Sequence, residues 1–170
     1  MATIISAIAL NHAIGKDNKL LLNDPVDMHM FNLTTVNNTV IMGKNTFNSL
    51  PVKPLPNRNN VVISSTMAKQ ESNFATLPYK VYSSLKSALQ HYPDSFIIGG
   101  EKIYKEALTL PEVSRMILTV HHYHPQDADT FFPEFNNAQW KPIKKIPYMF
   151  MVGKNDFIYS EITHFQKTNN

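Results

Sequence analysis

Short apolar runs rich in Val, Ile and Phe recur along the chain, and stretches with helical spacing separate them. The runs lie at 3–10, 39–43, 60–65, 80–83, 95–98 and 115–121, and most are apolar on both faces, as buried parallel strands are. Between them, the helical spacing is found at 25–36, 44–50, 84–91 and 101–108. This alternation predicts an α/β protein with a mostly parallel central sheet and helices on both faces.

The end of the chain has a different pattern. Residues 148–152 and 157–165 are two strand-like runs joined by the turn-forming sequence Gly-Lys-Asn-Asp, so we expect an antiparallel hairpin at one edge of the sheet. A length of 170 residues is enough for one core and too short for two ordinary ones. We therefore expect a single domain that spans residues 1–170.

Composition and charge exclude several classes of protein. The net charge of +3 is dispersed and forms no basic stripe, which argues against nucleic-acid binding. The apolar run at 3–10 is short and lacks a basic region before it, so we interpret it as a buried strand and not as a signal peptide. No apolar run approaches the roughly 20 residues that a membrane span needs. We expect a soluble, cytoplasmic protein that binds neither nucleic acid nor a membrane.

Three histidines near the end of the 115–121 strand raise the question of a metal site. His122 and His124 would share one strand face, an arrangement that can hold a metal ion. The chain has no cysteine, and no carboxylate pattern supplies a third ligand. We therefore predict no metal site.

The first predicted helix carries an acid in its first turn. Asp24 can cap the exposed amides, and Pro25 suits the first helical position, which places Asp27 in the first turn. Phe31 and Thr35 lie four and eight residues further on, on the same helical face. This position is compatible with a partly buried carboxylate.

An acid at such a position can also remain in water and simply stabilise the helix dipole. The loop before it favours a ligand site instead. Residues 20–22 are three consecutive leucines with no obvious core period. A flexible apolar loop beside an acid is typical of a small-molecule site that can close.

Two predicted strands run through glycines into helices. Residues 40–46 do so at Gly43, and residues 97–102 do so at Gly99 and Gly100. Free amides at the helix starts suit a phosphate, and both starts would lie at the carboxyl edge of a parallel sheet. Neither segment is a GxGxxG or Walker sequence, and either glycine alone could simply permit a tight turn. Two such places in one α/β domain favour a phosphate-bearing cofactor.

Many residues, from the start of the chain to about residue 165, stand in the order and spacing of one known family. They are Ala7, Ile14, Gly15, Pro25, Asp27, Phe31, Thr35, residues 41–44, Thr46, Ser49, Leu55, Pro56, Arg58, Ser64, Ser65, residues 98–100, Tyr104, Thr119, Asp129, Thr130, Phe132 and Pro133. This joint pattern resembles that of the dihydrofolate reductases.

The resemblance implies reduction of 7,8-dihydrofolate to 5,6,7,8-tetrahydrofolate by hydride transfer from NADPH, in support of one-carbon metabolism. Asp27 would hold N3 and the 2-amino group of the pterin and promote protonation at N5, while hydride goes to C6. Thr119 would complete that network, and Arg58 would pair with the α-carboxylate of the glutamate tail. Dihydrofolate and antifolates are thus the expected small-molecule ligands, and a monomer is the expected state.

The resemblance also implies two sets of binding residues. Around the substrate it places Ile5, Ala7, Met28, Phe31, Leu50, Leu55, Arg58, Ile98, Tyr104 and Thr119. Around NADPH it places Ala7, Ile14, Gly15, Leu20, Gly43, Lys44, Asn45, Thr46, Ser64, Ser65, Gly99, Gly100, Glu101, Lys102, Ile103 and Tyr104. Within the second set, Lys44, Asn45, Ser64 and Ser65 match positions that select the 2′-phosphate. The Gly99-Gly100 peptide matches one that is often cis in the family.

The chain departs from the family pattern beside the expected site. Leu21 and Leu22 replace the usual Pro-Trp, and Asp24 stands where an apolar residue is common. Two other functions therefore stay open. One is a related pyrimidine reductase of riboflavin synthesis, against which Arg58 argues because it is placed for a glutamate tail. The other is a folate- or NADPH-binding protein whose catalysis the loop change has impaired.

Overall fold

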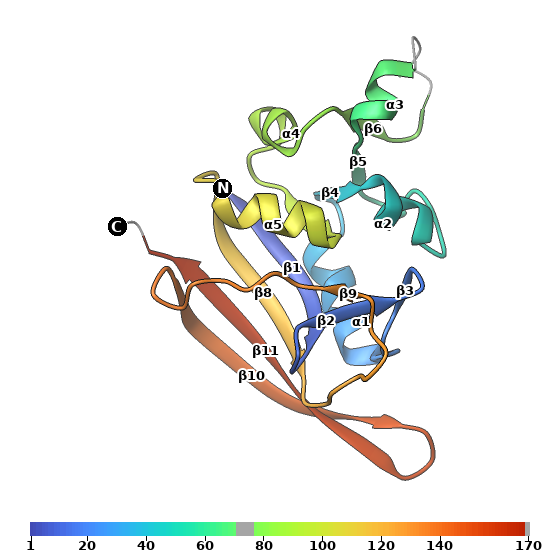
Figure 1. The fold of residues 1–170 in the computed structure, drawn as a ribbon, viewed down its shortest axis with the longest axis vertical. Coiled ribbons are helices and arrows are strands. Elements are labelled where there is room, and N and C mark those ends of the chain that lie inside the picture. Colours follow the sequence, from blue (N-terminus) through green and yellow to red (C-terminus); the bar gives the residue numbers. More distant parts are fainter. Residues whose placement is uncertain (71–76, 169–170) are drawn as a thin grey trace.

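Eight strands form the central sheet of the computed structural model, which describes residues 1–70 and 77–168 (Figure 1). Their order across the sheet is β10-β11-β8-β1-β7-β4-β5-β6. The bounds are β1 (Ala2–Ala9), β4 (Thr39–Gly43), β5 (Asn59–Ile63), β6 (Lys80–Tyr82), β7 (Phe96–Gly99), β8 (Val113–His121), β10 (Trp140–Val152) and β11 (Asp156–Lys167). The pairs from β8 to β6 are parallel, and β11 pairs antiparallel with both β8 and β10. The predicted parallel sheet with a C-terminal hairpin is confirmed.

The helices begin and end within about two residues of the predicted ranges, with one addition. They are α1 (Pro25–Thr35), α2 (Lys44–Ser49), α3 (Ser65–Gln70), α4 (Leu85–His91) and α5 (Glu101–Thr109). Helix α3 was not predicted, because the apolar run at 60–65 reads as strand to its end. The strand stops at Ile63, and the Ser64 hydroxyl then accepts a hydrogen bond from the Met67 amide at 3.2 Å. No helix in the described part of the chain is long and apolar enough to cross a membrane.

Alternating side chains of the central strands build two core layers on opposite faces of the sheet. Ile41 and Val61 belong to one layer together with buried side chains of α4 and α5. Val40 and Val62 belong to the other, together with Phe47 of α2. Because successive strand residues point to opposite faces, these two layers require helices on both sides. The predicted arrangement of helices is therefore confirmed.

A small three-stranded sheet, in the order β3-β2-β9, lies apart from the central one. It contains β2 (Ala13–Lys16), β3 (Lys19–Leu20) and β9 (Thr130–Phe131), none of which was predicted. Asp17 and Asn18 connect β2 to β3, and both have positive φ, at 50° and 59°. Two left-handed residues between paired strands are typical of a type I′ hairpin turn. The Asp-Asn pair was thus the available sequence signal for this hairpin.

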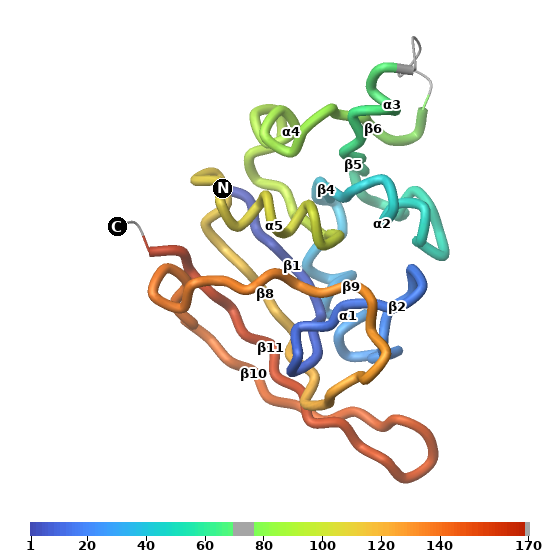
Figure 2. Tube along the Cα trace, viewed as in Figure 1, coloured from blue at the N-terminus to red at the C-terminus, as the bar shows by residue number. Residues whose placement is uncertain are grey.

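The C-terminal hairpin is longer than predicted, and its strand β11 pairs with β8 from Arg115 to His121 (Figure 2). Strand β10 starts at Trp140, eight residues before the predicted start at 148. The first part of β10 was missed because it contains Pro142 and Pro147. Proline lacks the backbone amide that a strand inside a sheet needs, so the sequence argues against a strand there. The sheet order makes β10 an edge strand, where proline is tolerated.

Trp140 anchors the unpredicted start of β10 in the main core, where its side chain is 1% exposed. Replacing it with alanine should lower the free energy of unfolding by about 3–5 kcal/mol, because a large buried ring is lost and a cavity remains. Urea unfolding followed by circular dichroism measures this, since Trp140 is also the only tryptophan signal.

Met149→Ala is the matched control on the same strand, because that side chain is 61% exposed. Its effect should stay within about 0.5 kcal/mol. A Trp140→Ala cost below about 1 kcal/mol would contradict the role of this residue in the core.

Candidate active site

The first turn of α1 brings two carboxylates together. Asp24 caps the helix: its Oδ1 accepts hydrogen bonds from the amides of Val26 at 2.8 Å and Asp27 at 3.2 Å. Pro25 occupies the first position of the helix, where its missing amide costs nothing. This start is the predicted one. It fixes the backbone of Asp27 against a buried side chain, because Asp24 is only 2% exposed.

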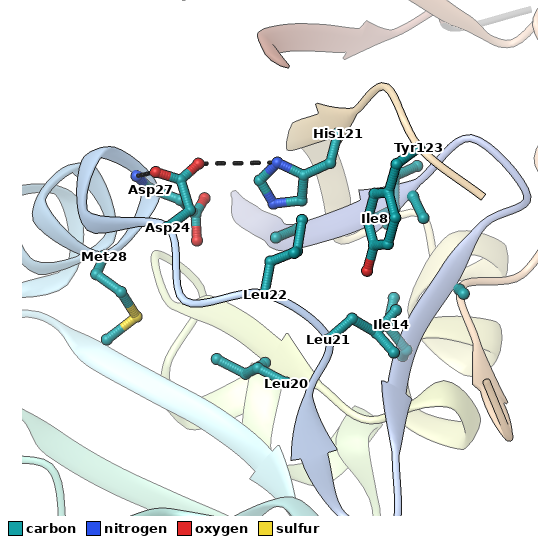
Figure 3. A pocket seen from close by; sticks show the side chains of 13 residues that line it. Ile8, Ile14, Leu20, Leu21, Leu22, Asp24, Asp27, Met28, His121 and Tyr123 are labelled. Carbon is teal, nitrogen blue, oxygen red and sulfur yellow. Dashed lines mark hydrogen bonds and ion pairs between the residues drawn. The ribbon is translucent and has the colours of Figure 1, made fainter. Parts of the chain in front are cut away.

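Asp27 lies in a pocket whose walls change its proton affinity (Figure 3). Burial raises the pKa of its carboxyl group, and the nearby negative charge of Asp24 raises it further. A hydrogen bond with the Thr119 side chain acts in the opposite direction. Asp27 is therefore the partly buried carboxylate that the helical spacing indicated, and Thr119 is beside it.

The pocket opens between α1, the ends of β1 and β8, and the segment before α1 (Figure 3). Apolar residues make up most of its lining: Ala7, Ile8, Ala9, Ala13, Ile14, Leu20, Leu21, Leu22 and Met28. The polar members are Asp24, Asp27, His121 and Tyr123. The three leucines thus lie beside the acid, as predicted, and Leu20 is 68% exposed.

Arg58 is held in place by α1 and by its own loop. Its guanidinium group donates to Thr35 Oγ1 at 2.8 Å, to Asn32 Oδ1 at 2.6 Å and to the Pro56 carbonyl at 2.7 Å. It also lies 5.6 Å from the centre of the Phe31 ring. Within the described residues, these contacts use one N–H of each terminal nitrogen and leave the second. Two parallel N–H groups are the arrangement that grips a carboxylate.

The other predicted substrate residues fall into two groups. Ala7 and Met28 line the pocket, and Ile5 lies two residues before Ala7 on β1. Leu50, Leu55 and Ile98 pack instead against the core layer of Val40 and Val62. A further member, buried Tyr104, donates its hydroxyl to the Ile5 carbonyl at 2.9 Å.

A second part of the site is the carboxyl edge of β4 and β7, where the two predicted glycine turns meet. A Cβ atom on Gly100 would lie 3.0 Å from Thr46 Oγ1, and one on Gly43 would lie 3.2 Å from Ile103 Cγ1 and 3.8 Å from the Gly99 carbonyl oxygen. Only backbone therefore fits at these two positions, because a side chain would come too close to α2 or α5. The peptide between Gly99 and Gly100 is cis, as the resemblance implied.

Polar side chains surround this glycine edge. Lys44, Asn45, Glu101 and Lys102 are exposed at the starts of α2 and α5, which follow Gly43 and Gly100 directly. At the end of β5, Ser65 is exposed, whereas Ser64 is buried and caps α3. Glu101 also accepts a hydrogen bond of 3.4 Å from the Phe131 amide, which joins α5 to β9. Gly15 lies on the neighbouring β2, where a Cβ would come within 3.0 Å of the Lys19 carbonyl.

Three polar residues near Asp24 were not predicted as part of the site. His121 and Tyr123 line the pocket, and the hydroxyl of Tyr148 donates to Asp24 Oδ2. The signal for His121 was its position two residues after Thr119 on one strand, which places both side chains on the same face. Among residues 1–70 and 77–168, no three His, Cys, Asp or Glu side chains group as metal ligands would.

The fold and the site together define a class of protein. A partly buried acid, Asp27, lies in a small and largely apolar pocket, and next to it the carboxyl edge of a parallel sheet offers glycine turns, helix starts and a lysine. Such an edge binds nucleotide phosphates in α/β proteins. The protein is thus an α/β enzyme that holds a nucleotide cofactor next to a small substrate.

Comparison with known proteins identifies the family within this class. A family model described as dihydrofolate reductase matches residues 1–163. Dihydrofolate reductase of Bacillus subtilis is 37% identical over 144 residues, which cover 83% of this chain and 80% of that protein. Dihydrofolate reductase type 3 of Salmonella typhimurium is 35% identical over 149 residues, with 85% and 86% covered. A structure of the Enterococcus faecalis enzyme with NADP(H) and RAB-propyl superposes with a TM-score of 0.83 at 26% identity, covering 99% of this chain and 97% of that one.

The chain belongs to the dihydrofolate reductase family. Its activity is the NADPH-dependent reduction of dihydrofolate, and it is an oxidoreductase of folate metabolism.

Gly99 has a φ of +121°, and a Cβ there would lie 3.2 Å from the hydroxyl oxygen of Tyr104. Gly99→Ala should therefore cost about 1–3 kcal/mol of stability and weaken NADPH binding roughly tenfold or more. Thermal unfolding and isothermal titration with NADPH measure the two effects.

Gly153→Ala is the matched control, since Gly153 also has a positive φ of +77° but nothing within 4 Å of an added Cβ. It should lose some stability and keep the affinity for NADPH. If both variants lost the same affinity for NADPH, the result would contradict the prediction that the glycine edge forms part of the cofactor site.

Proposed function

We propose that this chain performs the family's reaction with Asp27 as its single essential carboxylate. The observation that carries the proposal is the position of Asp27: it is partly buried, its pKa is raised, and it lies beside Thr119 at the end of an apolar pocket. A carboxylate there can accept two parallel hydrogen bonds from N3 and the 2-amino group of dihydrofolate. The same carboxylate favours the protonated pterin, which is the form that accepts a hydride at C6.

The proton and the ring are controlled by separate parts of the pocket. Thr119 orients the Asp27 carboxyl group through its hydrogen bond. Ala7 pairs with Thr119 across β1 and β8. The pterin ring would therefore lie against the ends of both strands. The leucines at 20–22 cover the opposite side and limit the access of water. A low-dielectric pocket strengthens the interaction of a carboxylate with a ring that gains a proton.

The residues of the glycine edge fit NADPH, which supplies the hydride when it is bound. Gly43, Gly99 and Gly100 bring backbone without side chains to this edge, and the nine-residue helix α5 starts there. Lys44, Asn45 and Ser65 are exposed nearby and would hold the 2′-phosphate that distinguishes NADPH from NADH. The point charge of Lys44 suits a phosphate without the bidentate grip of an arginine.

Arg58 would bind the glutamate tail of the substrate. Its three hydrogen bonds within the chain fix the plane of the guanidinium group, so little side-chain entropy is lost when a carboxylate arrives. This residue supports dihydrofolate as the substrate over the pyrimidine of riboflavin synthesis, which has no such tail.

We further infer that residues 1–170 act as one domain and as a monomer in the cytoplasm. One eight-stranded sheet contains both β1 and β11, so the first and last strands described belong to the same sheet. Strand β1 lies in the middle of the sheet, which supports its assignment as a core strand.

Asp27→Asn should lower the turnover of 7,8-dihydrofolate at neutral pH by at least about 100-fold, the usual contribution of a positioned acid or base. The loss of NADPH absorbance with purified enzyme measures this, and NADH serves as the comparison cofactor. Since burial disfavours the charged Asp27, the variant should unfold at neutral pH at no lower temperature than the parent.

Asp156→Asn removes an exposed acid at the start of β11 and should leave turnover unchanged. Near-normal activity of a folded Asp27→Asn variant would remove Asp27 from the mechanism. If the parent protein binds dihydrofolate and NADPH but shows no turnover, it is a binding protein whose catalysis the leucine loop has impaired.

Arg58→Lys should raise the KM for dihydrofolate about tenfold and change kcat little. The contact with the glutamate tail is equally strong in the bound substrate and in the transition state, so its loss weakens binding without slowing the chemical step. A dihydropterin that lacks the benzoylglutamate tail is the control substrate, and its kcat/KM should not change. Equal losses with both substrates would indicate that Arg58 supports the fold of α1 and not the tail.

A further inference from the structure

Four polar side chains from different segments of the fold meet behind Asp27, and three of them are buried. Asp24 at the start of α1 accepts a hydrogen bond from the hydroxyl of Tyr148 on β10. Its Oδ2 also lies 3.7 Å from His121 Nδ1 of β8 (Figure 3). The same His121 nitrogen lies 2.9 Å from the Ser160 hydroxyl of β11. Asp24, His121 and Ser160 are each 5% exposed or less. We call these four residues the Asp24 cluster.

The register of the sheet places three of these residues in one row. Tyr148 pairs with Ser160 across β10 and β11, and Ser160 pairs with His121 across β11 and β8. Asp24 lies at the end of that row and caps α1 with its other oxygen. The helix that carries Asp27 is thus tied to the C-terminal hairpin through one carboxylate.

Within the described residues, none of the groups that face Asp24 carries a positive charge at neutral pH. Burial lowers the pKa of His121, and Asp24 offsets only part of that effect, so the imidazole is neutral. Burial and the charges of Asp24 and Asp27 raise the pKa of Tyr148, so its hydroxyl stays protonated. Tyr123 lines the same pocket and also stays protonated, because burial raises its pKa. In the part of the chain that the structure describes, Asp27 is the other titratable group that lines this pocket.

We propose that Asp24 is a positioning residue for the reduction. As the cap of α1 it fixes the direction of Asp27, and its negative charge favours the protonated form of the active site. This inference rests on the proposed role of Asp27. An uncharged cap would hold the helix equally well, because asparagine and serine cap as strongly as aspartate does. The choice of an acid at a buried position therefore needs a reason beyond capping, and the proton demand of the reaction provides one.

The geometry makes the two contributions separable. The cap uses Oδ1 of Asp24, whereas the contacts with Tyr148 and His121 use Oδ2. Asp24→Asn keeps an oxygen for the amides and removes the charge. A phenol hydroxyl both donates and accepts, so Tyr148 can turn its hydrogen bond toward the new amide group.

The test is the pH dependence of hydride transfer in single turnovers, with NADPH deuterated at the transferred position to identify the step. In the parent enzyme the rate should fall as pH rises, because a proton is consumed. In Asp24→Asn, and equally in Asp24→Ser, this fall should move to lower pH by roughly 0.5 to 1 unit, since a like charge near Asp27 has been removed. The rate at low pH should match that of the parent enzyme.

Two controls separate charge from structure. Tyr148→Phe removes the hairpin contact but keeps the charge, so its profile should not move to lower pH. Asp156→Asn removes an exposed acid of the same hairpin and should leave the profile unchanged. Circular dichroism at each pH confirms that the variants stay folded.

Profiles of Asp24→Asn and Asp24→Ser that coincide with the parent profile would overturn the proposal, even while Asp27→Asn remains inactive. A parent enzyme without turnover, or an active Asp27→Asn variant, would instead refute the role of Asp27. A shift in both Asp24 variants and in neither control would establish Asp24 as a charge-dependent positioning residue.

Discussion

The close approach of two strand ends is the constraint on which the rest of the structure depends. Strand β7 runs between β1 and β4, so the turns at Gly43 and Gly99 lie side by side, where a Cβ on Gly43 would be 3.8 Å from the Gly99 carbonyl oxygen. Only backbone fits there, and α2 and α5 must start at the same rim. The neighbouring end of β1 forms the floor of the pocket. Cofactor and substrate sites are therefore adjacent because three parallel strands end together.

The order of elements was predictable because it depends on local signals. Buried strands are apolar on both faces, and Asp24-Pro25 marks the start of α1 from the sequence alone. The start of β10 at Trp140 and the small sheet with β2 were not predictable in the same way. Prolines on an edge strand and pairs of two to four residues carry little periodic signal, and only the tertiary neighbours decide their conformation.

The site was predictable where chemistry needs a particular residue and not where packing changes a residue's role. Asp27 and the glycine turns were identified from spacing, and the structure places them as expected. His121 was considered only as a metal ligand, because its sequence neighbours are histidines. Its partners Asp24 and Ser160 come from segments 97 and 39 residues away, and no local pattern contains that information. Long-range polar contacts of this kind emerge only from the sheet register.

The position of β11 has a consequence for how the enzyme is made. This last strand is inserted between β8 and β10, and it carries Ser160, the middle residue of the row that ends at Asp24. A slip of one residue in its pairing would turn Tyr148 away from α1. The pocket beside α1 is thus completed by a strand from much later in the sequence, so the active site of a nascent chain stays unfinished until β11 has been made and paired.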